Sequence, residues 1–266
     1  MSEKIKLFDI SKCTGCRGCQ LACKQWNQLK AKQTRHTGTY QNPPDLQANT
    51  YLLMRFQEMA DDKGSVKWFF RHSACMHCGD AACVKVCPSG ALYYTDMGTV
   101  GVNHSKCIAC KECISACPFD IPRYDNKTDK IYKCDMCESR LLNYMEPACA
   151  KACPTGALLW GDKEKLLKLA HKRADELGNG SYVYGDKYVN GTHLVYVLQE
   201  KASVYAALPS HPRVPASIVL WKDILKPLSL IAAGGVLAGS FLHFIIKGPK
   251  TLDKELLDEK KGGEQP

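Results

Sequence analysis

Sixteen cysteines arranged in four groups of four constrain this 266-residue chain more than any other feature of its sequence. Most gaps within a group are two or three residues long, and no cysteine lies outside a group. In chain order the quartets are Cys13, Cys16, Cys19 and Cys23; Cys75, Cys78, Cys83 and Cys87; Cys107, Cys110, Cys113 and Cys117; and Cys134, Cys137, Cys149 and Cys153. This grouping predicts sulfurs that converge in sets on metal centres.

The spacing of the third quartet indicates which metal group is bound. Residues 107–118, CIACKECISACP, match the bacterial ferredoxin run C-x2-C-x2-C-x3-C-P. The second quartet has two extra residues in its second gap, the fourth has eleven residues in that gap, and the first has Lys24 in place of the proline. The spacing therefore predicts four [4Fe–4S] clusters as cofactors.

Disulfides and zinc are the other common uses of clustered cysteines. A disulfide framework requires an oxidising compartment, and the N-terminal residues MSEKIKLFDI lack the apolar core of a signal peptide. Zinc sites typically use two distant Cys-x-x-Cys pairs rather than runs closed by Cys-Pro. A zinc-stabilised membrane scaffold is the alternative from another class; it would be colourless, whereas a cluster protein would be brown with about sixteen irons.

The ligands of each cluster are predicted from two-cluster ferredoxins, in which three close cysteines hold one cube and the fourth holds its neighbour. Quartets two and three are close in sequence and are expected to share a module, which leaves quartets one and four for another. This nested pairing gives cluster A (Cys13, Cys16, Cys19 and Cys153), cluster B (Cys23, Cys134, Cys137 and Cys149), cluster C (Cys75, Cys78, Cys83 and Cys117) and cluster D (Cys87, Cys107, Cys110 and Cys113). Pairing quartet one with two and three with four is also compatible with the spacing.

The net charge of +9 could indicate a nucleic-acid partner. However, an oxidised cube with four thiolates carries about −2, so four cubes would contribute about −8. Six cations flank the cysteines and could offset this charge: Lys12, Arg17, Lys24, Lys106, Lys111 and Lys133. We therefore expect no nucleic-acid partner.

The sequence contains no motif for another chemistry. It lacks C-x-x-C-H, a P-loop, G-x-G-x-x-G, H-E-x-x-H and G-x-S-x-G. His77 lies inside CMHC, but a Rieske histidine replaces a cysteine and none is missing, so we expect a structural histidine. The chain is therefore predicted to carry electrons without being an enzyme by itself.

The cysteine-free segments are expected to form packing and docking surfaces. In residues 35–71, the strand-like stretches TYLLMRFQ and VKWFF are separated by the turn signal DDKGS, which predicts a hairpin. After the last quartet we expect a strand in THLVYVLQE and, before it, an amphipathic helix capped by Asp162 and Gly178. The apolar stripe predicted for this helix contains Leu166, Leu169, Ala170 and Leu177.

Residues 227–246 form an uncharged stretch of twenty residues, PLSLIAAGGVLAGSFLHFII. A helix of this length spans about 30 Å, the thickness of a bilayer core, and Trp221 lies where an interfacial aromatic is expected. Gly235 and Gly239 would permit close contact with another membrane helix. His243 could border a quinone or haem of a partner, although an interfacial histidine is commoner. The alternative is a buried core helix.

Lysines and arginines give a weak indication of orientation. They are Arg213, Lys222 and Lys226 before the stretch, and Lys247, Lys250, Lys254, Lys260 and Lys261 after it. The excess after the stretch favours a single-pass protein of the cell membrane with a cytoplasmic tail and a periplasmic cluster domain. With no signal of its own, this domain would have to cross folded, together with a partner that has one.

Several stretches outside the quartets identify a resemblance: EPACAKACPTGAL, CPFDIPRYDNKTDKIYKCDMC, GTHLVYVL and the C-terminal LWKDILKPLS and FLHFIIKGP. With the order of the quartets, they resemble the iron–sulfur β subunit of respiratory formate dehydrogenases over essentially the whole chain. The resemblance implies two ferredoxin-like modules with nested pairing. It also implies electron transfer from a molybdenum or tungsten bis-pterin subunit that oxidises formate to a membrane cytochrome b subunit with haem b, and then to quinone. In the family, a twin-arginine signal on the catalytic subunit exports the pair to the periplasm.

The expected fold is α+β, with two ferredoxin-like double-[4Fe–4S] modules and one C-terminal transmembrane helix. The expected parts are 1–34 with 128–160 (first module), 35–71 (hairpin insert), 72–127 (second module), 161–217 (helix and strand), 218–247 (transmembrane helix) and 248–266 (polar tail). The runner-up function is the equivalent subunit of a sulfur-compound, dimethyl sulfoxide or nitrate reductase, or of a membrane hydrogenase.

Overall fold

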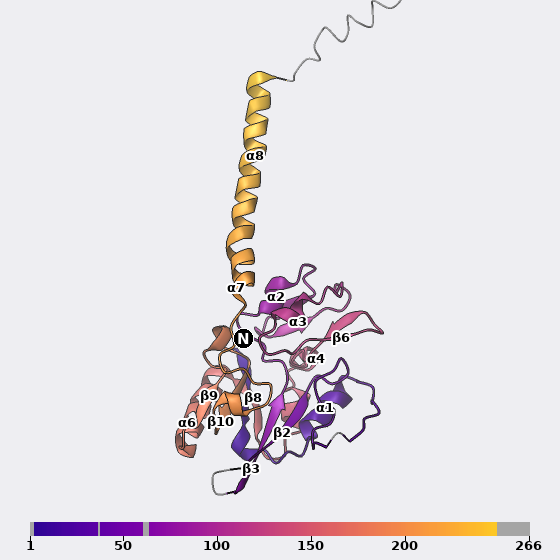
Figure 1. The fold of residues 1–266 in the computed structure, drawn as a ribbon, viewed down its shortest axis with the longest axis vertical. Helices are drawn as coiled ribbons and strands as arrows, with labels where there is room; N and C mark the ends of the chain where they lie inside the picture. The colour runs from indigo at the N-terminus through magenta and orange to yellow at the C-terminus, as the bar shows by residue number, and fades with distance from the viewer. Residues whose placement is uncertain (1–2, 37, 61–63, 249–266) are drawn as a thin grey trace, which may run out of the picture. The chain divides into compact units, whose positions relative to one another are not determined.

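The computed structural model describes residues 3–36, 38–60 and 64–248 (Figure 1). It divides into two units, Met1–Ile218 and Val219–Pro266. Most of the predicted polar tail and the first three residues of the predicted turn DDKGS lie outside the described residues.

A four-stranded sheet joins the two ends of the first unit. Its strand order is β8-β1-β10-β9. The inner strand β1 (Lys4–Asp9) is parallel to β10 (Leu194–Leu198) and antiparallel to β8 (Leu158–Asp162), and β9 (Tyr182–Tyr184) is antiparallel to β10. The sequence predicts β10, but not its pairing with a strand that precedes the first quartet.

The helix α6 (Lys163–Leu177) packs against this sheet (Figure 1). The predicted caps are confirmed, because the Lys165 amide donates to Asp162 Oδ1 at 3.3 Å and the helix ends at Gly178. The buried face consists of Leu166, Ala170 and Ala174, with Leu177 partly buried beside it. The prediction that Leu169 belongs to this stripe is wrong: its side chain is exposed, because it lies at the edge of the face formed by positions four residues apart.

Alternate residues of β1 face two different cores. Ile5 and Leu7 belong to the core beneath α6. Phe8 belongs to the larger core, which contains buried cysteines of the first and fourth quartets. Lys6 lies on the same side of the strand as Phe8 and is fully buried. The central strand therefore separates a purely apolar core from the part of the molecule that holds the cysteines.

Three two-stranded hairpins provide the other strands of this unit within residues 3–36, 38–60 and 64–218. The hairpin predicted in the insert consists of β2 (Leu53–Ala60) and β3 (Val66–Ser73), which are antiparallel. Quartets two and three are separated by the pair β4 (Leu92–Tyr94) and β5 (Val100–Val102), and quartets three and four by β6 (Arg123–Asp125) and β7 (Lys130–Tyr132).

Short helices accompany every quartet. They are α1 (Gly18–Trp26), α2 (Ala82–Val86), α3 (Glu112–Ala116), α4 (Glu138–Leu141) and α5 (Ala148–Lys151). Three 3-10 turns lie at Ile10–Lys12, Tyr188–Asn190 and Ala202–Val204. The helix α1 of the first quartet packs against α5 of the fourth, and α2 of the second packs against α3 of the third.

The C-terminal unit is helical. After α7 (Ala216–Val219) and a π-helical segment, Leu220–Leu225, the long helix α8 spans Lys226–Lys247. It contains the predicted apolar stretch, includes an 18-residue window with a mean hydropathy of 1.9 and is long and apolar enough to cross a membrane. None of this apolar window is buried, which does not fit the alternative of a core helix.

The pH dependence of stability should reveal the burial of His72 on β3. This ring is fully buried beside Phe8, with 5.7 Å between ring centroids, and burial together with the nearby Lys6 charge lowers its pKa well below the usual value. The unfolded chain binds a proton near pH 6.5 and the folded chain does not, so stability falls as the pH drops below about 6.5, by at most about 1.4 kcal/mol per pH unit.

We expect the thermal unfolding midpoint to fall less between pH 7.5 and 5 in the His72→Phe variant than in the parent. The exposed His36 provides the control, because His36→Phe should leave the pH dependence unchanged. Equal pH dependence in all three proteins would contradict the prediction.

Candidate metal centres

Three cavities of the first unit are lined by four cysteines each. One contains Cys13, Cys16, Cys19 and Cys153; a second contains Cys23, Cys134, Cys137 and Cys149; and a third contains Cys87, Cys107, Cys110 and Cys113. Four cysteine side chains thus converge on each of these three spaces.

The remaining four cysteines lie near enough to one another for the charge of one to affect the pKa of another. Burial and the neighbouring thiolates of Cys75, Cys117 and Cys83 raise the pKa of the Cys78 thiol well above its usual value. The structure therefore brings together cysteines of quartets one and four, and of quartets two and three. These are the four sets that the nested pairing predicts as clusters A to D.

Thiolates of one set also affect the pKa values of cysteines in a neighbouring set. Burial raises the pKa of the Cys19 thiol in set A, and Cys149 of set B raises it further. Burial likewise raises the pKa of Cys134 in set B to about 11, with Cys75 of set C among the contributors. Cys83 of set C has its pKa raised to about 12 by burial, with a contribution from Cys113 of set D. The sets therefore follow one another in the order A, B, C, D.

Sets A and D, which lie at the two ends of this order, are open to solvent, and sets B and C are less exposed. Cys16 in set A and Cys110 in set D are exposed. In set B all four cysteines are buried. A partner can therefore approach sets A and D, whereas set B is enclosed by protein.

One backbone turn recurs in all four quartets. The residue before the second cysteine has a positive φ in each: 68° at Gly15, 48° at His77, 56° at Ala109 and 62° at Met136. Three of these residues have side chains that rarely adopt this conformation. The same local turn therefore precedes the second cysteine in every quartet.

Backbone amides point at several of the sulfurs. Gly15 N donates to Cys13 Sγ and Met136 N to Cys134 Sγ, both at 3.4 Å, and Leu158 N donates to Cys153 Sγ at 3.3 Å. Such hydrogen bonds stabilise thiolates and tune the potentials of iron–sulfur clusters. The recurring turn therefore provides both the sulfur geometry and part of the electrostatic environment.

Most of these thiols are held in surroundings that disfavour their charged form. Burial raises the pKa of both Cys113 and Cys137 to about 12. A metal can bind only the thiolate, so the positive charge of the metal must stabilise the negative charge that the apolar surroundings disfavour. The cysteines therefore fit sites completed by a metal cation, and a [4Fe–4S] core held by four thiolates would supply that charge.

His77 has a structural role. Its ring is fully buried, and its Nδ1 accepts a hydrogen bond of 3.0 Å from the amide of Val100 on β5. The interaction joins the turn of the second quartet to the hairpin that follows it. This agrees with the prediction that His77 is a structural histidine, which was made because no cysteine is missing from the quartets.

Of the six predicted flanking cations, Lys133 alone is buried. Its Nζ donates to the carbonyls of Val100 at 2.6 Å and Cys134 at 3.0 Å. Lys6, which was not predicted from the sequence, is also buried and lines the cavity of set B. The sequence feature that could have identified Lys6 is its position in KIKLFD, where it alternates with apolar residues on a buried strand.

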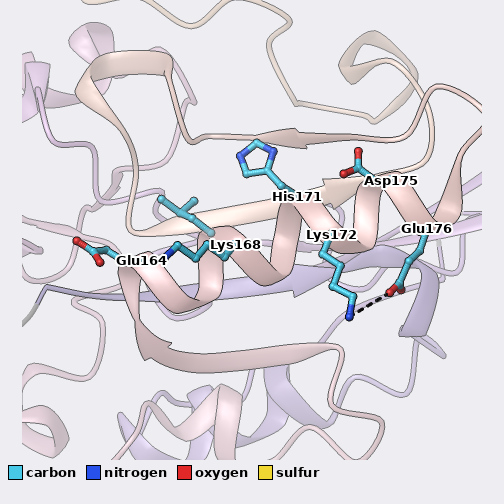
Figure 2. A pocket seen from close by; sticks show the side chains of 7 residues that line it. Glu164, Lys168, His171, Lys172, Asp175 and Glu176 are labelled. Carbon is cyan, nitrogen blue, oxygen red and sulfur yellow. Dashed lines mark ion pairs between the residues drawn. The ribbon is translucent and has the colours of Figure 1, made fainter.

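A surface hollow lies elsewhere, on the outer side of α6 (Figure 2). It is lined by Glu164, Leu167, Lys168, His171, Lys172, Asp175 and Glu176. Its charges are mixed, Lys172 and Glu176 are 3.8 Å apart, and no cysteine borders it. The hollow therefore has no connection with the cysteine sets.

Comparison with protein families gives three matches. Two models described as 4Fe-4S dicluster domain match residues 12–91 and 66–163. A model described as formate dehydrogenase N, transmembrane, matches residues 214–256. These matches include every quartet and the whole of α8.

Characterised relatives cover nearly the whole chain. The nitrate-inducible formate dehydrogenase iron–sulfur subunit of Escherichia coli is 40% identical over 98% of this chain and 90% of its own length. The formate dehydrogenase-O iron–sulfur subunit of the same organism is 39% identical over 95% of this chain and 86% of its own length. One polypeptide of the anaerobic dimethyl sulfoxide reductase of Haemophilus influenzae is 38% identical over 60% of this chain and 74% of its own length.

Proposed function

Because this chain belongs to the iron–sulfur subunits of formate dehydrogenases, we propose that it conducts electrons from a formate-oxidising molybdenum or tungsten subunit to a membrane cytochrome b and quinone. It is the electron-transfer subunit of the complex and contains two [4Fe–4S] dicluster domains. Four bound cubes would each take up and release one electron at a time.

The order of the cysteine sets is the observation that carries this proposal. Sets A to D follow one another through the first unit, with an exposed cysteine in each end set. An electron can then enter at one end and leave at the other, while the protein shields the intermediate sites from water. A single redox centre or an enzyme's substrate site would not require such a series.

The nested ligand sets are part of the proposal. Clusters A and B form one module, residues 1–34 with 128–160, and clusters C and D form the other, residues 72–127. The contacts of α1 with α5 and of α2 with α3 support this division, as do the three cavities lined by four cysteines each. Residues 35–71 and 161–217 then provide packing and docking surfaces.

We propose that α8 anchors the subunit in the cell membrane, with the cluster domain in the periplasm and the tail in the cytoplasm. Gly235 and Gly239 on this helix leave open space around them, which supports close packing against a helix of the cytochrome b subunit. His243 lies near the C-terminal end of α8, where an interfacial histidine is expected.

The equivalent subunit of another membrane oxidoreductase is the alternative. The relative from a dimethyl sulfoxide reductase supports it around the cysteines but covers only 60% of the chain. The match of residues 214–256 to the formate dehydrogenase transmembrane family favours formate.

Purification of the complex from membranes tests the function. We expect a tagged chain to co-purify with a molybdenum or tungsten subunit and a b-type cytochrome, and the preparation to reduce a quinone analogue with formate. The matched control reactions are the reduction of the quinone analogue with hydrogen, and the oxidation of the corresponding quinol with dimethyl sulfoxide, nitrate or a sulfur compound. Activity with one of these and none with formate would contradict the proposal.

Replacement of single cysteines tests the nested pairing. Cys153→Ser should remove or alter the redox component of cluster A, and Cys149→Ser that of cluster B, with iron falling from about sixteen to about twelve atoms per chain in a variant that loses one cube. Redox titration followed by electron paramagnetic resonance distinguishes the components. Loss of one and the same component in both variants would contradict the pairing.

Truncation tests the membrane anchor. A chain that ends at Leu220 lacks α8 and should weaken the attachment of the cluster domain to membranes, most clearly after a salt wash. A chain that ends at Gly248 keeps α8 and provides the matched control. If both truncated chains remain on washed membranes, contacts with partner subunits hold the domain in place and the anchor is unnecessary.

A further inference from the structure

Lys6 occupies a position where a charged residue is unusual. It lies on β1, which is hydrogen-bonded to a strand on each side, with Leu194 of β10 and Trp160 of β8 opposite it. Its own amide donates to the carbonyl of His193 at 2.8 Å. The backbone is thus fixed, and the side chain lies on the face of the strand that Phe8 shares with the cysteines.

The ammonium group of Lys6 has no hydrogen-bond partner. The residue is fully buried, and within the described part of the chain no acceptor satisfies its Nζ. It lines the cavity that contains Cys23, Cys134, Cys137 and Cys149. Asp135 also borders this cavity, but its Oδ1 accepts a hydrogen bond from the Cys137 amide, and no ion pair joins it to Lys6 among the described residues.

A buried ammonium without a partner is strongly unfavourable, so it requires a nearby anion. The site that Lys6 lines would supply one, because a cube held by its four cysteines would carry a net charge of about −2. The burial of Lys6, its unpartnered Nζ and its place on this cavity therefore fit a positive charge that faces cluster B.

We propose that the Lys6 ammonium is the buried counter-charge of cluster B and raises the reduction potential of that cube. The inference rests on the ligand set proposed for cluster B. When one electron arrives from a neighbouring cube, the net charge of the site changes from about −2 to about −3, no bond forms or breaks, and Lys6 keeps its proton. Because opposite charges attract more strongly in a poorly solvated interior, Lys6 favours the reduced form.

The neighbouring set provides an internal comparison. Phe8, two residues further along the same face of β1, lines the cavity of set A. One strand thus presents a positive charge to one site and an uncharged ring to the next. The strand thereby gives the two sites different electrostatic surroundings.

The experiment uses the full chain in its complex with three substitutions. Lys6→Met removes the charge at nearly constant length, Lys6→Arg keeps it, and Lys4→Met removes an exposed charge two residues earlier on the same strand. The readout is a redox titration followed by electron paramagnetic resonance, together with iron content. Cluster B is identified as the component that Cys149→Ser removes.

In Lys6→Met we expect a lower midpoint potential for the cluster B component. The ratio of reduced to oxidised form at a fixed potential should fall at least tenfold, which is about 59 mV for one electron. The other three components should shift much less. Lys4→Met should match the parent, and Lys6→Arg should restore most of the potential.

Each of the other possible outcomes either supports or overturns the inference. An unchanged cluster B potential in an iron-replete Lys6→Met protein overturns it. If Lys6→Met loses the cube, retention in Lys6→Arg supports a need for the charge, whereas loss in both variants shows a packing role and overturns it. A parent protein without iron, or without a distinct component lost in Cys149→Ser, would contradict the proposed clusters themselves.

Discussion

The binding of buried thiolates to cationic iron is the interaction on which the rest of this structure depends. Burial raises the pKa of thiols such as Cys113 and Cys137 to about 12, so these groups are poor anions without a metal. The recurring positive φ before the second cysteine of each quartet is likewise a conformation that three non-glycine residues adopt at a cost. Both unfavourable features are offset when metal binds, because ligand binding that exists only in the folded state contributes to its stability.

The central sheet explains how the ends of the chain meet. In the antiparallel pairing of β1 with β8, Phe8 lies opposite Leu158. Cys13 follows Phe8 by five residues and Cys153 precedes Leu158 by five residues, so the two strands deliver both cysteines to one edge of the sheet. The Asp9 amide, which donates to the Ala157 carbonyl at 2.8 Å, extends the same pairing toward them. The proximity of quartets one and four is thus a consequence of strand register.

Much of the site could be predicted from the sequence, because its information is local. The cysteine spacing, the caps of α6 and the apolar stretch within α8 each depend on neighbouring residues. The pairing of β1 with β8 and β10 joins residues at least 150 positions apart, and nothing in the short KIKLFD stretch indicates its partners. Lys6 was missed for the same reason: its burial follows from the strands on both sides. Leu169 is the opposite error: it is an exposed apolar residue beside the buried stripe of α6 and was predicted to belong to that stripe.

The distribution of positive charge follows from the same topology. At sets A and D, exposed Cys16 and Cys110 allow water to screen the negative charge of a site. Set B is shielded from water and set C is shielded in part, so screening there must come largely from the protein. Among the described residues the buried lysines are Lys6, which borders set B, and Lys133, whose charge opposes the rise that burial causes in the pKa of Cys83 in set C. Among the described residues, these two buried lysines therefore place positive charge at the inner sites, and Asp135 adds a carboxylate that also borders set B.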